Sequence, residues 1–261
     1  MFQKVRENAR RSACLSNEKQ IGLAVMQYTQ DNDETYPRGA INQGSGYTLS
    51  FGWAGIVYPY VKSVAVFGCP DDPGSKGDKV SYAYSVSISD GPVGTPGMGD
   101  TYGIGGALSR FNAPAKTVML FEVQYRNDSN VSILNESQGI LDGNSRNDSG
   151  GSTGRQYSWY TFGKYATGPF SNVSQPADFA DTGFLSMTGR HNDGANYLLA
   201  DGHAKWLRSS AISAGGPAPT PTANATTNGS QSGDILNASG TECTTDPYCP
   251  NGTCAATFSP T

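Results

Sequence analysis

Two histidines and two aspartates lie close together in the sequence, and imidazole and carboxylate groups together can bind a metal ion. They are His191, Asp193, Asp201 and His203. Two turns that approached each other would bring these four groups together around one metal ion. The simpler interpretation, which we favour, is that the His191 side chain hydrogen-bonds to turn backbone and that Asp201 holds a hairpin.

Other chemistry-bearing patterns are weak. The chain has only two histidines, and it contains neither a Gly-x-Ser-x-Gly nucleophile elbow nor a phosphate-binding loop. We therefore expect no enzymatic activity, no catalytic residue and no resident cofactor. Calcium is the alternative, because carboxylates gather in two places without matching a known ligand motif. These carboxylates are Asp31, Asp33 and Glu34, and further along Asp71, Asp72 and Asp78.

The spacing around Asp201-Gly202 predicts a β-hairpin. This dipeptide lies between two apolar runs and is typical of a two-residue type I′ turn. Pairing across such a turn places Leu199 opposite Ala204. Alternation then predicts one buried face made of Tyr197, Leu199, Ala204 and Trp206.

Three further segments have the pattern of strands. Residues 117–123 form a nearly continuous apolar run, which predicts a central strand. Residues 80–88 alternate and predict another strand, and residues 184–187 predict a third before the hairpin. Together they indicate a small antiparallel meander that ends near Leu207.

The chain begins with the pattern of a long helix. Residues 2–30 contain no proline and one glycine. A helix of that length spans about 45 Å, so part of it should project from a domain of this size. It should end near 31–33. The predicted apolar stripe consists of Phe2, Val5, Ala9, Ala13, Ile21, Val25 and Tyr28.

These two ends together resemble a known class of surface protein. Residues 5–24 resemble the segment that follows the membrane helix in type IV pilin-like proteins and type II secretion pseudopilins. His191, nine residues and then Asp201-Gly202 resemble the signature of prepilin-type His-x9-Asp-Gly proteins. Weaker similarity continues through residues 28–37, 69–71, 81–84 and 113–118, so the resemblance spans 2–208.

The resemblance implies both a fold and a function. The implied fold is α+β, with a long N-terminal helix packed by its C-terminal half on an antiparallel sheet. The implied function is that of a structural subunit in an extracellular pilus-like filament or pseudopilus, whose partners are copies of itself. Family members begin with a leader and about 20 apolar residues, which this sequence lacks. We therefore expect Met1 to stand at a truncation point, left by cloning or processing, and membrane contact only through the absent segment. The alternative is a natural relative that dispenses with the membrane helix.

Composition agrees with an extracellular or cell-surface location. Charged residues make up 15% of the chain, and the net charge of −4 gives no basic surface for nucleic acid. The alternative function is a monomeric surface module that binds a glycan or a protein through an aromatic cluster. That cluster consists of Tyr157, Trp159, Tyr160, Phe162, Tyr165 and Phe170, and its simpler interpretation is packing over the sheet or at a subunit contact.

We divide the chain into three parts. The helix occupies residues 1–36, and a globular sheet domain with a polar insertion at 126–156 occupies 37–212. A tail rich in Pro, Thr, Ser and Asn follows at 213–261, and its composition predicts an extended or disordered segment.

The cysteines form two groups. A Cys14–Cys69 disulfide would tie the helix to the sheet domain, and two buried free thiols are the alternative. The tail carries Cys243, Cys249 and Cys254, an odd number, so one of them either pairs between chains or stays free.

Asn-x-Ser/Thr sequons are frequent and could carry glycans, although a polar loop composition alone also produces them. They begin at Asn127, Asn130, Asn135, Asn147, Asn172, Asn224, Asn228, Asn237 and Asn251.

Overall fold

A computed structural model describes the N-terminal helix, most of the predicted sheet and the segments between them. The described residues are 2–37, 52–72, 80–85, 88, 106–124, 164–165 and 190–208, with short pieces at 212–213, 226–227, 235–236 and 255–257. Several predictions lie outside them: the insertion, the strand at 184–187, Asp78, the tail cysteines, the sequons and, apart from Tyr165, the aromatic cluster.

The predicted N-terminal helix is confirmed. Helix α1 runs from Phe2 to Asp31. It ends where Asp33 and Glu34 adopt positive φ and the Glu34 N–H turns back to the Thr29 carbonyl at 3.0 Å. In the part of the chain that the structure describes, no helix is both long enough and apolar enough to cross a membrane.

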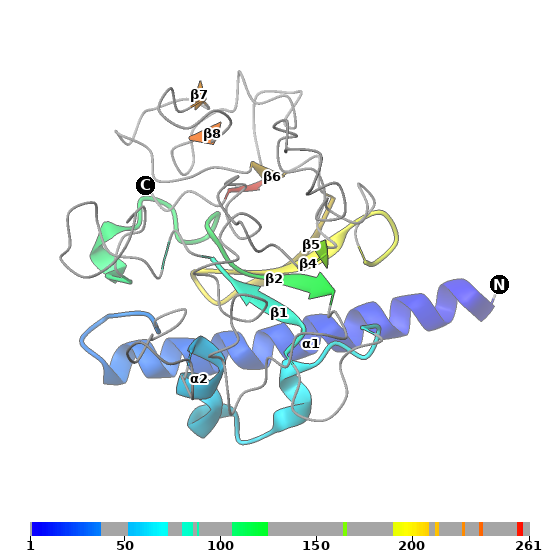
Figure 1. Cartoon of the computed structure of the whole chain (residues 1–261), viewed down its shortest axis with the longest axis horizontal. Helices are drawn as coiled ribbons and strands as arrows, with labels where there is room; N and C mark the ends of the chain where they lie inside the picture. Colours follow the sequence, from blue (N-terminus) through cyan, green and yellow to red (C-terminus); the bar gives the residue numbers. More distant parts are fainter. Residues whose placement is uncertain are drawn as a thin grey trace, which may run out of the picture.

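The buried side of α1 differs from the predicted stripe over its first half. The buried side chains of α1 are those of Cys14, Glu18, Ile21, Ala24, Val25 and Thr29. The predicted positions Val5, Ala9 and Ala13 are exposed, because the sheet covers the helix only further along. The N-terminal end of α1 extends past the sheet in Figure 1. The projecting turns therefore have little of their own chain to pack against.

The sheet is antiparallel, and the predicted fold class is confirmed. Its strands follow the order β1 (Tyr82–Tyr84), β2 (Val118–Gln124), β4 (Ala195–Leu199) and β5 (Ala204–Leu207), with β3 (Lys164–Tyr165) paired to the end of β2. The apolar run at 117–123 is indeed the central strand. The strand predicted over 80–88 is shorter than expected.

Short elements complete the described structure. They are α2 (Trp53–Val61), the 3-10 turns η1 (Val64–Phe67) and η2 (Leu108–Arg110), and two small strand pairs: β6 (Ile212–Ser213) with β9 (Ala256–Thr257), and β7 (Thr226–Thr227) with β8 (Ile235–Leu236).

The hairpin between β4 and β5 exists, but its predicted register is wrong by one residue. The Leu199 N–H donates to the His203 carbonyl at 2.8 Å, and the Gly202 N–H donates to the Leu199 carbonyl at 2.9 Å. The connection is therefore a three-residue loop that closes with Gly202 at φ +87°. Leu198 pairs with Ala204, and Asn196 with Trp206. A shift of one residue exchanges the two faces, so Asn196 lies on the face where Tyr197 was expected.

Helix α1 lies between the sheet on one side and α2 with η1 on the other (Figure 1). Leu198 of β4 reaches toward Gly22 of α1. On the other side of α1, Trp53 of α2 lies 5.9 Å from Phe67 and 6.1 Å from Tyr84, between ring centroids. The core thus includes α1 from Cys14 onward, with the sheet packed on one side of the helix and α2 with η1 on the other.

Replacing Gly22 by alanine should destabilise the protein, although alanine normally stabilises a helix interior by about 0.5–1 kcal/mol. A Cβ at this position would lie 2.8 Å from Leu198 Cδ1 and 3.0 Å from the Gly202 carbonyl oxygen. Such overpacking costs about 1–3 kcal/mol. We expect a net loss of about 1 kcal/mol in urea unfolding. The exposed helix change Ser16→Ala is the control, and a Gly22→Ala variant as stable as that control would show that β4 can move away.

Candidate functional site

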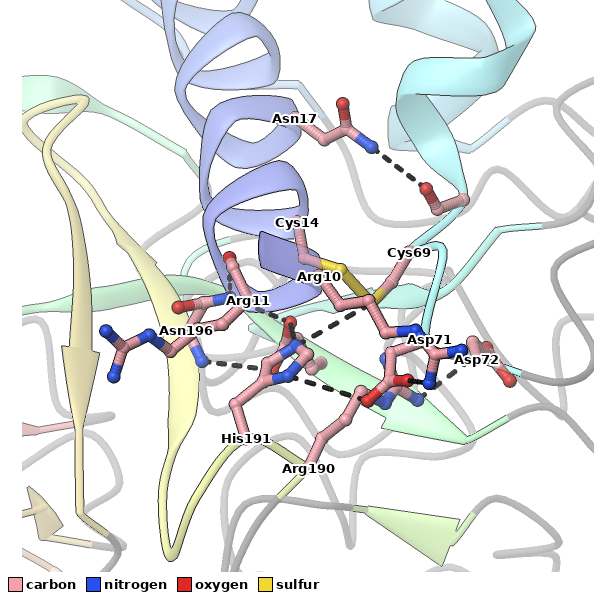
Figure 2. The surroundings of a disulfide bond; sticks show 12 residues. Arg10, Arg11, Cys14, Asn17, Cys69, Asp71, Asp72, Arg190, His191 and Asn196 are labelled. Atoms are coloured by element: carbon pink, nitrogen blue, oxygen red, sulfur yellow. Dashed lines mark hydrogen bonds and ion pairs between the residues drawn. A yellow bond between two sulfur atoms is a disulfide. The ribbon is translucent and has the colours of Figure 1, made fainter. Parts of the chain in front are cut away.

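A disulfide between Cys14 and Cys69 fixes α1 to the segment that follows η1. The two cysteines are 55 residues apart in sequence and fully buried. One turn further along α1, the Asn17 side-chain amide donates to the Gly68 carbonyl at 2.9 Å (Figure 2). The helix is therefore held to this segment by both a covalent bond and a hydrogen bond.

His191 lies on a tight turn that leads into β4. Its N–H donates to the Gly194 carbonyl at 2.8 Å, and its carbonyl accepts from the Trp206 indole N–H at 2.7 Å. Asn192 and Asp193 adopt positive φ, a conformation that these two residue types tolerate better than most. The N–H and the carbonyl of His191 are thus both hydrogen-bonded, and its imidazole lies next to α1.

The His191 side chain binds carboxylates rather than backbone, which corrects our interpretation from the sequence. Its Nδ1 lies 2.9 Å from Glu7 Oε1, and its Nε2 lies 3.0 Å from Glu122 Oε1. The Sγ of Cys69 is 3.7 Å from the same Nε2. The reason is the turn just described, whose backbone groups bond to each other and to Trp206. Figure 2 shows the imidazole beside the disulfide.

Glu122 is the buried acceptor at the centre of this arrangement. It lies opposite Tyr82 of β1. On its other side, Asn196 donates its backbone N–H to Oε2 at 3.0 Å and its side-chain amide to Oε1 at 3.1 Å. Burial lowers the pKa of His191, but the hydrogen bond and charge of Glu122 and the hydrogen bond of Glu7 together raise it above 6.5.

Two arginine–aspartate pairs border the site. Arg10 lies 2.7 Å from Asp71, and Arg190 lies 3.6 Å from the buried Asp72. Two of the aspartates suggested for calcium thus have cationic partners. Of the other suggested group, Asp31 accepts from the Tyr60 hydroxyl at 3.1 Å.

The structure does not gather the four residues first considered for a metal. Asp201 instead closes its own hairpin loop: it accepts the His203 N–H at 3.0 Å and lies 2.7 Å from His203 Nδ1. The His203 side chain is 74% exposed. Among the described residues, potential metal-ligand groups form around His191 with other partners, namely Cys14, Cys69 and Glu122 on one side and Glu7 and Asp71 on the other.

Sequence reasoning missed Glu7 and Glu122. Glu122 did leave a signal, because it is the one charged residue within the apolar run 117–123. Glu7 left none, since it lies on a helix rich in charge and is 184 residues from His191.

Glu18 is a second buried carboxyl group, one helical turn beyond Cys14. Neither of its oxygens has a hydrogen-bond partner among the described residues. Burial raises the pKa of Glu18 well above 4.5, the charge of Glu122 adds to this, and Arg190 opposes it. The group is therefore neutral over a range of pH in which an exposed glutamate is ionised.

The comparison with known families adds one match. Residues 3–63 match a family model described as a protein of unknown function (DUF1559). The matched span includes almost all of α1 and the whole of α2, and it contains residues 5–24, one of the two segments on which the resemblance to pilin-like proteins depends. No curated protein and no solved structure matches the chain.

Replacing both Cys14 and Cys69 by serine should lower the free energy of unfolding by about 4 kcal/mol, because the disulfide restricts a loop of 55 residues in the unfolded chain. Urea unfolding in metal-free buffer measures the loss. Reduction of the unmodified protein should reproduce it. A loss below about 1 kcal/mol would contradict this explanation through the entropy of the unfolded chain.

Stability should fall as the pH rises above 4.5, through Glu18. There the unfolded state releases the Glu18 proton while the folded state retains it, so the folded state binds more protons. Glu18→Gln, which is neutral at every pH, should lack this fall. Its advantage over the unmodified protein should grow with pH, by about 1.4 kcal/mol for each unit by which the pKa is raised.

Urea unfolding at a series of pH values tests this expectation. The exposed Glu34→Gln change is the matched control, and it should not alter the pH dependence. Parallel curves for the unmodified protein and Glu18→Gln would show that water reaches the Glu18 carboxyl group.

Proposed function

We propose that the chain is a structural subunit of an extracellular pilus-like filament or pseudopilus. The observation that carries this proposal is the projecting end of α1. The side chains of residues 3–6 are all exposed although the helix is regular throughout, and contacts with the domain begin at Glu7. A long helix with its first turns outside its own domain is suited to packing against helices of other subunits.

The exposed surface of α1 offers apolar contacts for such packing. The side chains of Val5 and Leu23 are 62% and 72% exposed. Isolated exposed apolar residues are common on soluble proteins, so the argument depends on their position on a projecting helix. Contact with a neighbouring helix would remove them from water.

The attachment of α1 to its domain fits a load-bearing subunit. Pulling on the helix would act on the Cys14–Cys69 disulfide and on the contacts of Glu7 and Asn17. A disulfide also favours an oxidising location outside the cytosol. Residues 3–63, which match the family of unknown function DUF1559, contain the helix segment that resembles pilin-like proteins, and this supports the same proposal.

Electron microscopy of the source cells, with intact mass of the extracted subunit, tests the proposal directly. Filaments should be present and should contain this chain. Cysteine introduced at Val5 should then form cross-links between subunits within those filaments when a bifunctional maleimide is added.

Lys205→Cys is the matched control, because Lys205 is exposed on β5, on the sheet rather than on the helix. It should remain uncross-linked when the Val5→Cys subunits react. Cells that display the chain only as a monomer would overturn the proposal. Equal cross-linking at both positions would exclude a helical filament core.

A further inference from the structure

Four side chains with metal-binding atoms meet at one buried point beneath α1. They are Cys14, Cys69, Glu122 and His191, and one ligand atom from each lies within 4.8 Å of those of the others. All four residues are fully buried. They come from α1, the segment after η1, β2 and the turn before β4, so the folded chain is required to bring them together.

We propose that the same four side chains bind one zinc ion when Cys14 and Cys69 are in the dithiol state. Every chain is synthesised with free thiols, so this state precedes the disulfide. A thiol reductant regenerates it by transferring two electrons and two protons to the two sulfurs, and is itself oxidised to a disulfide. Zinc then binds two thiolates, the His191 imidazole and the Glu122 carboxylate, and the two thiol protons are released to solvent.

The distances agree with a tetrahedral site. Bond lengths of about 2.0–2.3 Å to zinc place neighbouring ligand atoms roughly 3.3–3.8 Å apart. The 3.7 Å between His191 Nε2 and Cys69 Sγ lies within this range, and the 3.0 Å between Nε2 and Glu122 Oε1 is a hydrogen-bond distance that has to lengthen slightly when a metal replaces the proton. Cleavage of the S–S bond frees the two sulfurs to separate by rotation about their Cα–Cβ bonds. Two thiolates, one imidazole and one carboxylate are also ligand types that zinc accepts.

The surrounding hydrogen bonds are those that such a site needs. When Nε2 binds a metal, Nδ1 carries the proton, and Glu7 Oε1 is in place to accept it at 2.9 Å. A carboxylate behind the imidazole fixes the ring and its tautomer in many zinc sites. Asn196 in turn donates to both oxygens of Glu122 and fixes its orientation.

The local charge also favours a cation. Glu122 is fully buried and contributes one carboxylate to the group of four side chains. Two thiolates would add further negative charge. A divalent ion offsets that charge in an interior where unpaired charges are costly.

A second group, formed by Glu7, Asp71 and His191 Nδ1, competes for the same imidazole. It is less suitable, because Asp71 is already paired with Arg10 at 2.7 Å and its Oδ2 lies 3.7 Å from Nδ1. It also contains no sulfur. The sulfur ligands therefore distinguish the two groups experimentally.

Cobalt(II) titration of the reduced chain tests the proposal, because cobalt reports thiolate ligands and tetrahedral geometry in its absorption spectrum. The full chain is used with its three tail cysteines replaced by serine, so that only Cys14 and Cys69 supply thiols. One cobalt ion per chain should bind, with sulfur-to-cobalt charge-transfer bands. Stoichiometric zinc should displace it, and oxidation to the disulfide should abolish binding.

Variants distinguish a cobalt site formed by all four side chains from nonspecific binding of cobalt by the two thiols. Glu7→Ala, which leaves all four ligands in place, should weaken cobalt affinity about 10- to 100-fold. His191→Gln should abolish the tetrahedral spectrum, whereas His203→Gln, at the other and exposed histidine, should leave it unchanged. Circular dichroism of each variant in the oxidised state establishes that it folds.

Three results would overturn the proposal. One is the absence of sulfur bands in the reduced chain. Another is a spectrum that His191→Gln and Glu122→Gln leave unaltered, which would show binding by the two thiols alone. The third is equal cobalt affinity of the oxidised chain, which would assign the ion to Glu7, Asp71 and His191.

Discussion

Glu122 places a carboxylate between the central strand and α1, and an ionised group in that position must be compensated by hydrogen bonds or opposite charge. Asn196 and His191 provide this compensation. Asn196 can do so only in the observed register of the hairpin, with its side chain on the helix-facing side of β4. The compensation of the buried Glu122 carboxylate thus depends on the pairing of β4 with β5 and on the turn before β4 that carries His191.

Glu122 also contributes to the attachment of α1 to the sheet. His191 bridges Glu122 to Glu7, and so extends the contact from the sheet to the second turn of the helix. The disulfide at Cys14 and the amide of Asn17 continue the attachment along the helix. Further on, Gly22 allows close approach of β4. The helix is therefore attached by polar and covalent contacts near its N-terminal end and by close packing further along.

How much of the fold and of the site can be predicted from the sequence depends on how far apart the interacting residues lie along the chain. Local patterns predicted α1 and β2, since α1 shows helical periodicity without proline and β2 is a nearly continuous apolar run. The hairpin register was missed, because Asp-Gly is compatible with both a two-residue and a three-residue loop, which differ in where the αL residue lies. The role of His191 could not be found locally, since its partners Glu122 and Glu7 are 69 and 184 residues away. A lone glutamate in an apolar run was the one available signal.

The pairing of Glu7 with His191 and of Asn8 with Asn192 joins the beginning of the chain to residues 184 positions later. Translation produces α1 well before these partners. Until the partners emerge, α1 has no sheet to cover its apolar stripe. Contacts so distant in sequence also slow folding, because they close long loops. The order of synthesis therefore leaves the helix available to other proteins, such as chaperones or export factors, until β4 and β5 emerge.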